Sequence, residues 1–257
     1  TKKVLGQLKL AVVASQPRTV QTGELELPII EPVGVPREQG LVAVIAPDSI
    51  EVNSDPTKLE SARAATPAEL AVRGFNPQPP PGSTVAASFA FTRRPVKIGL
   101  ATRERPRRVL ASVSTVASVK EDMVSVTTKI IYDIQYAGTD TFRFAAPATA
   151  KLEITGDGIK EKRKADQAED DGSVIWTVVL HSEALGSRGL TVTYDEKISV
   201  PEKGVSQLIQ PIRLLDVDRE TGEIAILKDR SLAISATQEG LEEIDARELT
   251  IGISRVR

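Results

Sequence analysis

The chain has 257 residues, a formal net charge of −2, 40% hydrophobic residues and no cysteine. Such a length can bury a large core, and the composition is that of a folded chain rather than a disordered one. The near-neutral charge excludes a global field that would gather nucleic acid or anionic membrane, and the lack of cysteine excludes disulfides, thiolate metal sites and a cysteine nucleophile. No apolar stretch reaches the ~18 residues that span a bilayer, so neither a membrane span nor a nucleic-acid partner is expected.

Short strands and one or two short helices are predicted for the first hundred residues. Apolar residues alternate over 8–14, which predicts a strand. Residues 66–69 (Thr-Pro-Ala-Glu) have the spacing of a capping box with proline at the first helical position, which predicts a short helix. Residues 55–56 (Asp-Pro) could cap another short turn, and the proline-rich run 75–82 is a loop or semi-rigid linker. Two further strands are predicted at 85–91 and 96–101.

A basic cluster follows these strands and is the strongest local charge bias in the chain. Arginine forks match phosphate and acidic polysaccharide, so the cluster could bind an anionic polymer. The alternative is charge on edge strands and loops, which keeps sheets from pairing with other chains. The cluster comprises Arg93, Arg94, Lys97, Arg103, Arg105, Arg107 and Arg108.

The central part of the chain has the clearest alternation. A strand is predicted at 109–119 and a long, half-buried one at 124–136. The inward face of the second would carry Val124, Val126, Thr128, Ile130, Tyr132, Ile134 and Tyr136. Residues 137–140 (Ala-Gly-Thr-Asp) resemble a turn, so the long strand is expected to continue as a hairpin through Phe142 and Phe144.

More strands are predicted before residue 200, at 152–154, 174–180 and 190–194. The charged run from Lys160 to Asp171 is expected to form a solvated hairpin tip. The single histidine, His181, follows an apolar strand, and nothing in the sequence supplies the acid and nucleophile of a catalytic triad. A strand-end histidine at the surface is therefore the favoured interpretation.

The most informative feature is an internal repeat. Residues 35–52 and 217–234 align without a gap at an offset of 182, with six identities in 18 positions, and the apolar phase also agrees. The identical pairs are Val35/Val217, Arg37/Arg219, Glu38/Glu220, Gly40/Gly222, Ala43/Ala225 and Ser49/Ser231.

Each copy is predicted to read strand, Arg-Glu-x-Gly turn, strand, short turn, strand. The glycine fits a turn position that requires positive φ. Both apolar faces, including Val42, Val44, Ile224 and Ile226, are expected to be buried. If the copies are equivalent, the later part of the second unit lies beyond Arg257, and the chain is part of a larger repeating protein.

The segment DVDRETGEIAIL, residues 216–227, could begin a calcium loop or form a hairpin tip. A calcium loop needs glycine at its sixth position and a bidentate acid at its twelfth, where this chain has Thr221 and Leu227. The hairpin is therefore favoured.

The sequence thus predicts an all-β fold of β-sandwiches built from antiparallel hairpins. The expected organisation is a first repeat unit at 1–102, a central all-β segment at 103–200 and a second repeat unit at 201–257 that packs with the first. The favoured function is a noncatalytic structural or interaction module of a larger bacterial cell-envelope or extracytoplasmic protein, partnered by other domains of that protein or by itself. A polyanion- or glycan-binding module and a hydrolase-associated domain are the alternatives, and no cofactor or metal is expected.

Overall fold

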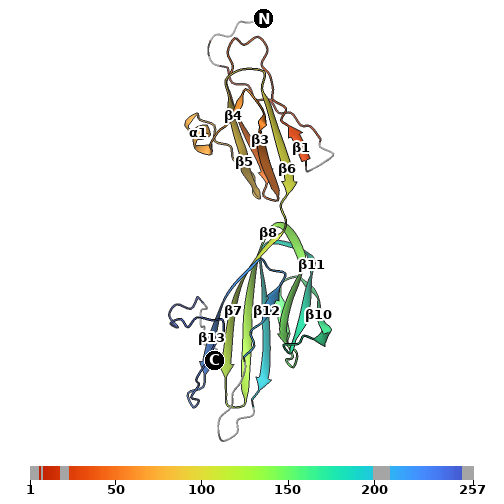
Figure 1. Ribbon diagram of the computed structural model, residues 1–257, viewed down its shortest axis with the longest axis vertical. Helices are drawn as coiled ribbons and strands as arrows, with labels where there is room; N and C mark the ends of the chain where they lie inside the picture. Colours follow the sequence, from red (N-terminus) through yellow and green to blue (C-terminus); the bar gives the residue numbers. More distant parts are fainter. Residues whose placement is uncertain (1–5, 7, 18–22, 199–208, 251–257) are drawn as a thin grey trace. The chain divides into compact units, whose positions relative to one another are not determined.

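The structure is a computed structural model that describes residues 6, 8–17, 23–198 and 209–250. These residues form thirteen strands and one helix (Figure 1). The predicted all-β class is confirmed. The chain divides into two compact units, Thr1–Arg105 (unit 1) and Pro106–Arg257 (unit 2). The expected boundary between residues 102 and 103 lies close to this division.

Unit 1 contains two three-stranded antiparallel sheets. One has the order β1-β6-β3 and the other β2-β5-β4. Apolar side chains from both sheets form a single cluster around Phe89, Ile98 and Leu100, so one core lies between them. The strands are β1 (Gly23–Glu26), β2 (Gly40–Pro47), β3 (Ile50–Glu60), β4 (Ala62–Ala64), β5 (Ser83–Phe91) and β6 (Lys97–Glu104).

The predicted capped helix is present as α1 (Pro67–Val72). The Thr66 hydroxyl accepts a hydrogen bond from the backbone N–H of Glu69, which satisfies one of the free donors at the helix start. Leu70 is the buried residue that anchors the helix. The second possible turn, at Asp55-Pro56, is wrong as a helix, because this segment lies within β3 where its register against β6 shifts.

The predicted strand at 8–14 is not present. Leu8, Leu10, Val12 and Val13 are described without strand pairing and are 63–96% exposed. Alternation alone does not make a strand, because the backbone also needs a partner for its hydrogen bonds.

Unit 2 is built on one seven-stranded sheet with the main order β10-β11-β8-β7-β13; β12 also pairs with β8, and β9 with β11. Its two longest strands, β8 and β11, pair with each other from end to end. The strands are β7 (Arg108–Val119), β8 (Met123–Pro147), β9 (Glu153–Gly156), β10 (Ile159–Ala168), β11 (Ser173–Lys197), β12 (Arg213–Leu215) and β13 (Arg219–Lys228).

The predicted turn at 137–140 is wrong, because β8 runs through it. Thr139 is paired with Ala184 of β11, so the turn-like residues belong to the ladder. The strands bend instead: the register shifts between Val179 and Gly186, and Tyr136 and Gly186 have φ of 73° and 79°. Likewise, the strands predicted at 174–180 and 190–194 are two halves of β11.

Bending lets both halves of each long strand share one core. Tyr132 and Ile134 come from the first half of β8, and Phe142 and Phe144 come from the second; all four belong to the largest apolar cluster of the unit. The inward face predicted for 124–136 is confirmed from Val124 to Ile134, whose alternate residues are buried, but not at Tyr136, which is only half-buried at the bend.

The expected second repeat unit at 201–257 is not separate from the central segment. Residues 199–208, including the boundary expected near Val200, lie outside the described part of the chain. After them, β12 pairs with β8, and β13 pairs in parallel with β7. The described strands β12 and β13 therefore belong to the same sheet as β7, the first strand of unit 2. Figure 1 shows β13 (blue) alongside β7.

The predicted Arg-Glu-x-Gly turn is also wrong in the second copy, because residues 219–222 already lie within β13. Neither Gly40 nor Gly222 has positive φ. Both are close-approach glycines: a Cβ at Gly40 would lie 2.2 Å from Cζ of Phe91, and one at Gly222 would lie 3.0 Å from the Val113 carbonyl oxygen. The repeat thus conserves tight packing against a neighbouring strand, not a turn.

Candidate functional site

Arg94, a half-buried member of the predicted basic cluster, is held by Glu38. Its Nε and Nη2 donate to the two carboxylate oxygens of Glu38 at 2.8 Å each, and Nη2 also donates to the Ile30 carbonyl at 2.7 Å. The hydrogen bond from Arg94 holds the pKa of Glu38 below its ordinary value. Both side chains are largely shielded, at 21% and 17% exposed. Arg94 therefore fixes the loop between β5 and β6 to the segment before β2.

Two more members of the cluster are paired with glutamates on β3. Lys97 lies 3.2 Å from Glu60, and Nε of Arg103 donates to Glu51 at 2.6 Å. Exposed pairs of this kind contribute little stability, yet they neutralise two of the cations that could have bound an anion. Arg93 lies in unit 1 before Arg94, and Arg105 ends that unit and acts electrostatically on Glu51.

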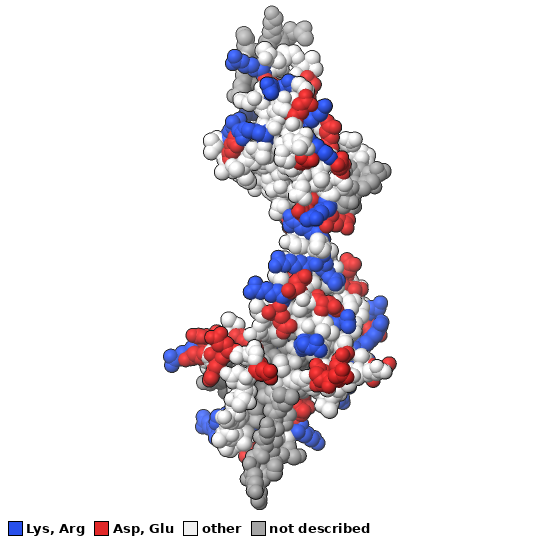
Figure 2. All heavy atoms as spheres, viewed as in Figure 1, with Lys and Arg blue, Asp and Glu red and all other residues white. Residues whose placement is uncertain are grey.

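Arg107 and Arg108 belong to unit 2, so the cluster is divided between the units. On the face in view in Figure 2, acidic and basic side chains are interleaved over each unit. Sequence reasoning finds the cations but misses Glu38, although its recurrence as Glu220 in the repeat is a signal for it.

This pairing gives a prediction for polyanion binding. We expect weak retention on a heparin-like polymer, and little change when Arg103, Arg105, Arg107 and Arg108 are replaced by serine. The log–log slope of affinity against salt should correspond to about one released counterion or fewer. A steep salt dependence that the serine variant abolishes would contradict this and establish an anion site.

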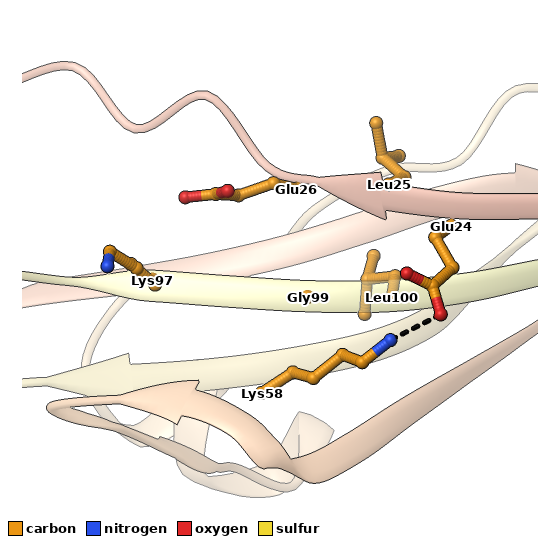
Figure 3. A pocket seen from close by; sticks show the side chains of 7 residues that line it. All are labelled: Glu24, Leu25, Glu26, Lys58, Lys97, Gly99 and Leu100. Atoms are coloured by element: carbon orange, nitrogen blue, oxygen red, sulfur yellow. Dashed lines mark hydrogen bonds and ion pairs between the residues drawn. The ribbon is translucent and has the colours of Figure 1, made fainter.

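A shallow groove of about 310 Å³ crosses the β1-β6-β3 sheet of unit 1 (Figure 3). Lys58 on β3 reaches over Gly99 of β6 to an ion pair with Glu24 on β1. A Cβ at Gly99 would lie 2.8 Å from Cβ of Lys58, so the glycine makes this crossing possible. The hydrogen bond with Glu24 raises the pKa of Lys58. The Lys58–Glu24 ion pair therefore lies on the wall of the groove, and because both side chains are exposed it contributes little stability.

A cavity of about 90 Å³ lies in unit 2, beside Tyr132. It is lined by side chains from β7, β8 and the segment after β12, including Arg107, Thr139, Thr141 and Asp216. Tyr132 is 1% exposed and its hydroxyl has no hydrogen-bond partner within the described chain. Burial raises its pKa. The cavity is well below the ~300 Å³ of ordinary ligand pockets.

The acidic residues at 216–220 hold β13 in place. Asp218 and Val109 exchange two hydrogen bonds, because the Asp218 carboxylate accepts from the Val109 N–H at 2.6 Å and the Asp218 N–H donates to the Val109 carbonyl at 2.8 Å. Asp216 has φ of 60° and lies 3.3 Å from Arg143. The hairpin-tip interpretation of 216–227 is therefore wrong. Residues 216–218 connect β12, which pairs with β8, to β13, which pairs with β7, and residues 219–227 lie within β13.

Glu220 differs from its counterpart Glu38. Desolvation raises its pKa, and a hydrogen bond from the Leu214 backbone opposes that shift. Glu220 has no ion pair with any basic side chain that the structure describes. It thus keeps the position of Glu38 in the repeat without an arginine like Arg94.

The remaining sequence candidates are placed as follows. His181 lies within β11 at the register shift and is exposed, and its backbone N–H donates to the Gly158 carbonyl. Over the described ranges, no three histidine, cysteine, aspartate or glutamate side chains are grouped to hold a metal ion. The one described helix is too short to cross a membrane.

Comparison with known proteins adds no relative. The chain matches no known protein family. It also matches no curated protein sequence.

Proposed function

We propose that this chain is a noncatalytic β-sandwich module that carries tension and forms contacts within a larger extracytoplasmic protein of the bacterial cell envelope. The observation that carries this proposal is the parallel ladder between β7 and β13. These are the first and last described strands of unit 2, and they pair over ten residues, from Arg219 with Leu110 to Lys228 with Val119.

Parallel pairing of the two terminal strands determines how a pulling force acts. One end of the force enters at the start of β7 and the other at the end of β13, which are opposite ends of the ladder. The strands must then slide past each other, so the evenly spaced hydrogen bonds share the load instead of breaking one at a time. Backbone bonds extend the ladder at both ends: Asp218 with Val109 at 2.8 Å and Asp229 with Val119 at 3.1 Å.

The candidate polar sites support the same proposal. In the basic cluster, the groove of unit 1 and the acids at 216–220, some side chains form internal pairs that hold separate segments together: Arg94 with Glu38, Lys58 with Glu24, and Asp218 with Val109. Such pairs are used to fix the architecture and leave these side chains less available for a ligand.

The proposal is tested by pulling single molecules from two directions. Because the chain has no cysteine, cysteines introduced at chosen positions give unique attachment points. Handles at Pro106→Cys and Arg230→Cys load the ladder in shear. Handles at Pro106→Cys and Arg219→Cys lie at the same end of the ladder and peel it open. At one pulling speed we expect the mean unfolding force in shear to be at least about twice that in peeling, because forced unfolding follows the unfolding barrier.

Equal forces in the two geometries would show that the ladder does not resist tension, and would remove the basis of the proposal. Unchanged tryptophan fluorescence of both cysteine variants at rest is the control for intact folding.

A further inference from the structure

The two copies of the repeat place matching apolar residues in different surroundings. In the first copy, five apolar side chains pack against Phe89, Ile98 and Leu100 in the core of unit 1. Each has a large apolar counterpart 182 residues later. The pairs are Val42/Ile224, Val44/Ile226, Val52/Ile234, Leu59/Leu241 and Ala62/Ile244.

Four of the five counterparts in the second copy are exposed to solvent. The exposed fractions are 44% for Ile226, 39% for Ile234, 53% for Leu241 and 45% for Ile244. The expectation that Ile226 is buried is therefore wrong, and Val44 in the first copy is only half-buried. Single exposed apolar residues are common, but these four keep the spacing of core residues, which is the mark of a surface that is covered in the assembled state.

The first copy shows what the second lacks. In unit 1, β2 pairs with β5 and β3 pairs with β6, and these two partner strands carry the three central core residues. In the second copy, β13 is an outer strand that pairs with β7 alone among described strands, and residues 232–242, which correspond to β3, are described without strand pairing. The missing element is thus a hairpin of the β5–β6 kind.

The surroundings of the two equivalent glutamates, Glu38 and Glu220, indicate the same hairpin. Glu38 is neutralised by Arg94, which lies in the loop joining β5 to β6. Glu220, its counterpart, has no described basic partner and is partly desolvated. A hairpin with the pattern of β5–β6 would bring both the apolar cover and the arginine.

We infer that residues 222–244 are a docking surface for an antiparallel β-hairpin with the alternating apolar pattern of β5–β6, presented by a partner domain. The hairpin would add one strand to β13 and order residues 232–242 as a second strand, which is recognition by strand addition. This inference deepens the proposed function, since it names the contact through which the module joins its neighbour.

The test supplies the hairpin to the full chain. A second copy of residues 76–105 is appended directly after Arg257, which preserves the offset of 182 between the copies. We expect amide hydrogen exchange over 232–244 to slow by about tenfold or more, because these backbone groups acquire strand partners. Trypsin cleavage after Arg247 should slow in parallel.

Two matched controls separate docking from mere proximity. In the first, the appended copy carries aspartate at the positions of Phe89 and Ile98; in the second, the receiving surface carries Leu241→Asp. Both should return exchange and cleavage to the rates of the unmodified chain. Leu241→Asp alone should leave the unmodified chain stable, since Leu241 is 53% exposed.

Two results would overturn the inference. One is equal exchange over 232–244 with the intact and the aspartate-bearing hairpins. The other is a dimer of the unmodified chain, seen by analytical ultracentrifugation, that Leu241→Asp dissociates, because the occupant would then be a second copy. Neither result affects the pulling experiment on β7 and β13, so failure here is distinguishable from failure of the proposed function.

Discussion

Replacing Phe144 with alanine is expected to lower the free energy of unfolding of unit 2 by about 3–5 kcal/mol, the range for deleting a buried phenyl ring. Phe144 is 0% exposed and lies in the largest core cluster, between strands β11 and β12. Its neighbours are held in ladders on both sides, so they cannot collapse into the cavity.

Tryptophan fluorescence measures this loss selectively. The only tryptophan, Trp176, lies on β11 and packs against the same cluster, so its signal reports unit 2 and not unit 1. Denaturant unfolding of Phe144→Ala should give a lower midpoint with an unchanged slope. The control is Leu185→Ala, where the side chain is 62% exposed and a change within about 0.5 kcal/mol is expected. A loss below about 1 kcal/mol for Phe144→Ala would contradict the shared core of unit 2.

Replacing Gly40 with alanine is expected to destabilise unit 1 by about 1–3 kcal/mol, the usual cost of overpacking. The added Cβ would lie 2.2 Å from Cζ and 2.3 Å from Cε1 of Phe91. Phe91 is 5% exposed and has the Arg94 guanidinium 5.7 Å from its ring centroid, so the ring has little room to move.

A double-mutant cycle isolates the contact. Gly40→Ala should cost less in a Phe91→Leu background than in the wild type, because the shorter side chain leaves room for the Cβ. Circular dichroism or calorimetry follows unit 1, while the Trp176 fluorescence transition should not change. An equal cost in both backgrounds would refute the close-approach role of Gly40.

Alternation in the sequence predicts the strands of unit 2 well where one face of a strand is buried. Strands were predicted over 109–119 and 124–136, and the structure buries alternate residues from Val109 to Ala117 and from Val124 to Ile134. The rule works there because the same side of the strand meets one core along its whole length.

The same reasoning fails where long-range pairing decides the outcome. Residues 137–140 have turn composition, yet β11 pairs with β8 on both sides of them and carries the strand through. Residues 8–14 have strand composition, yet no described strand pairs with them. In both cases the result depends on a distant partner that local sequence does not contain.

The sequence identifies the basic residues of the candidate site, but it does not identify the glutamates that pair with them. Arg94 and Glu38 are 56 residues apart, and Arg103 and Glu51 are 52 apart. A local charge count registers these two arginines as unbalanced, whereas the fold brings a glutamate to both of them. The repeat was visible in the sequence, but the sequence does not show that its two copies have different surroundings. One copy packs into the core of unit 1, and the other lies at the edge of the sheet of unit 2.

The register of β13 has a consequence for biosynthesis. Arg219 pairs with Leu110, and the other pairs keep the same separation, so the ribosome must add more than a hundred residues before β7 gains this neighbour. Contacts so distant along the chain form slowly, and until they form, the nascent polypeptide has an open strand edge that other chains can capture. Chains interrupted before Arg219 would keep the edge of β7 open, whereas in the complete chain the outermost strand on that side of the sheet is β13.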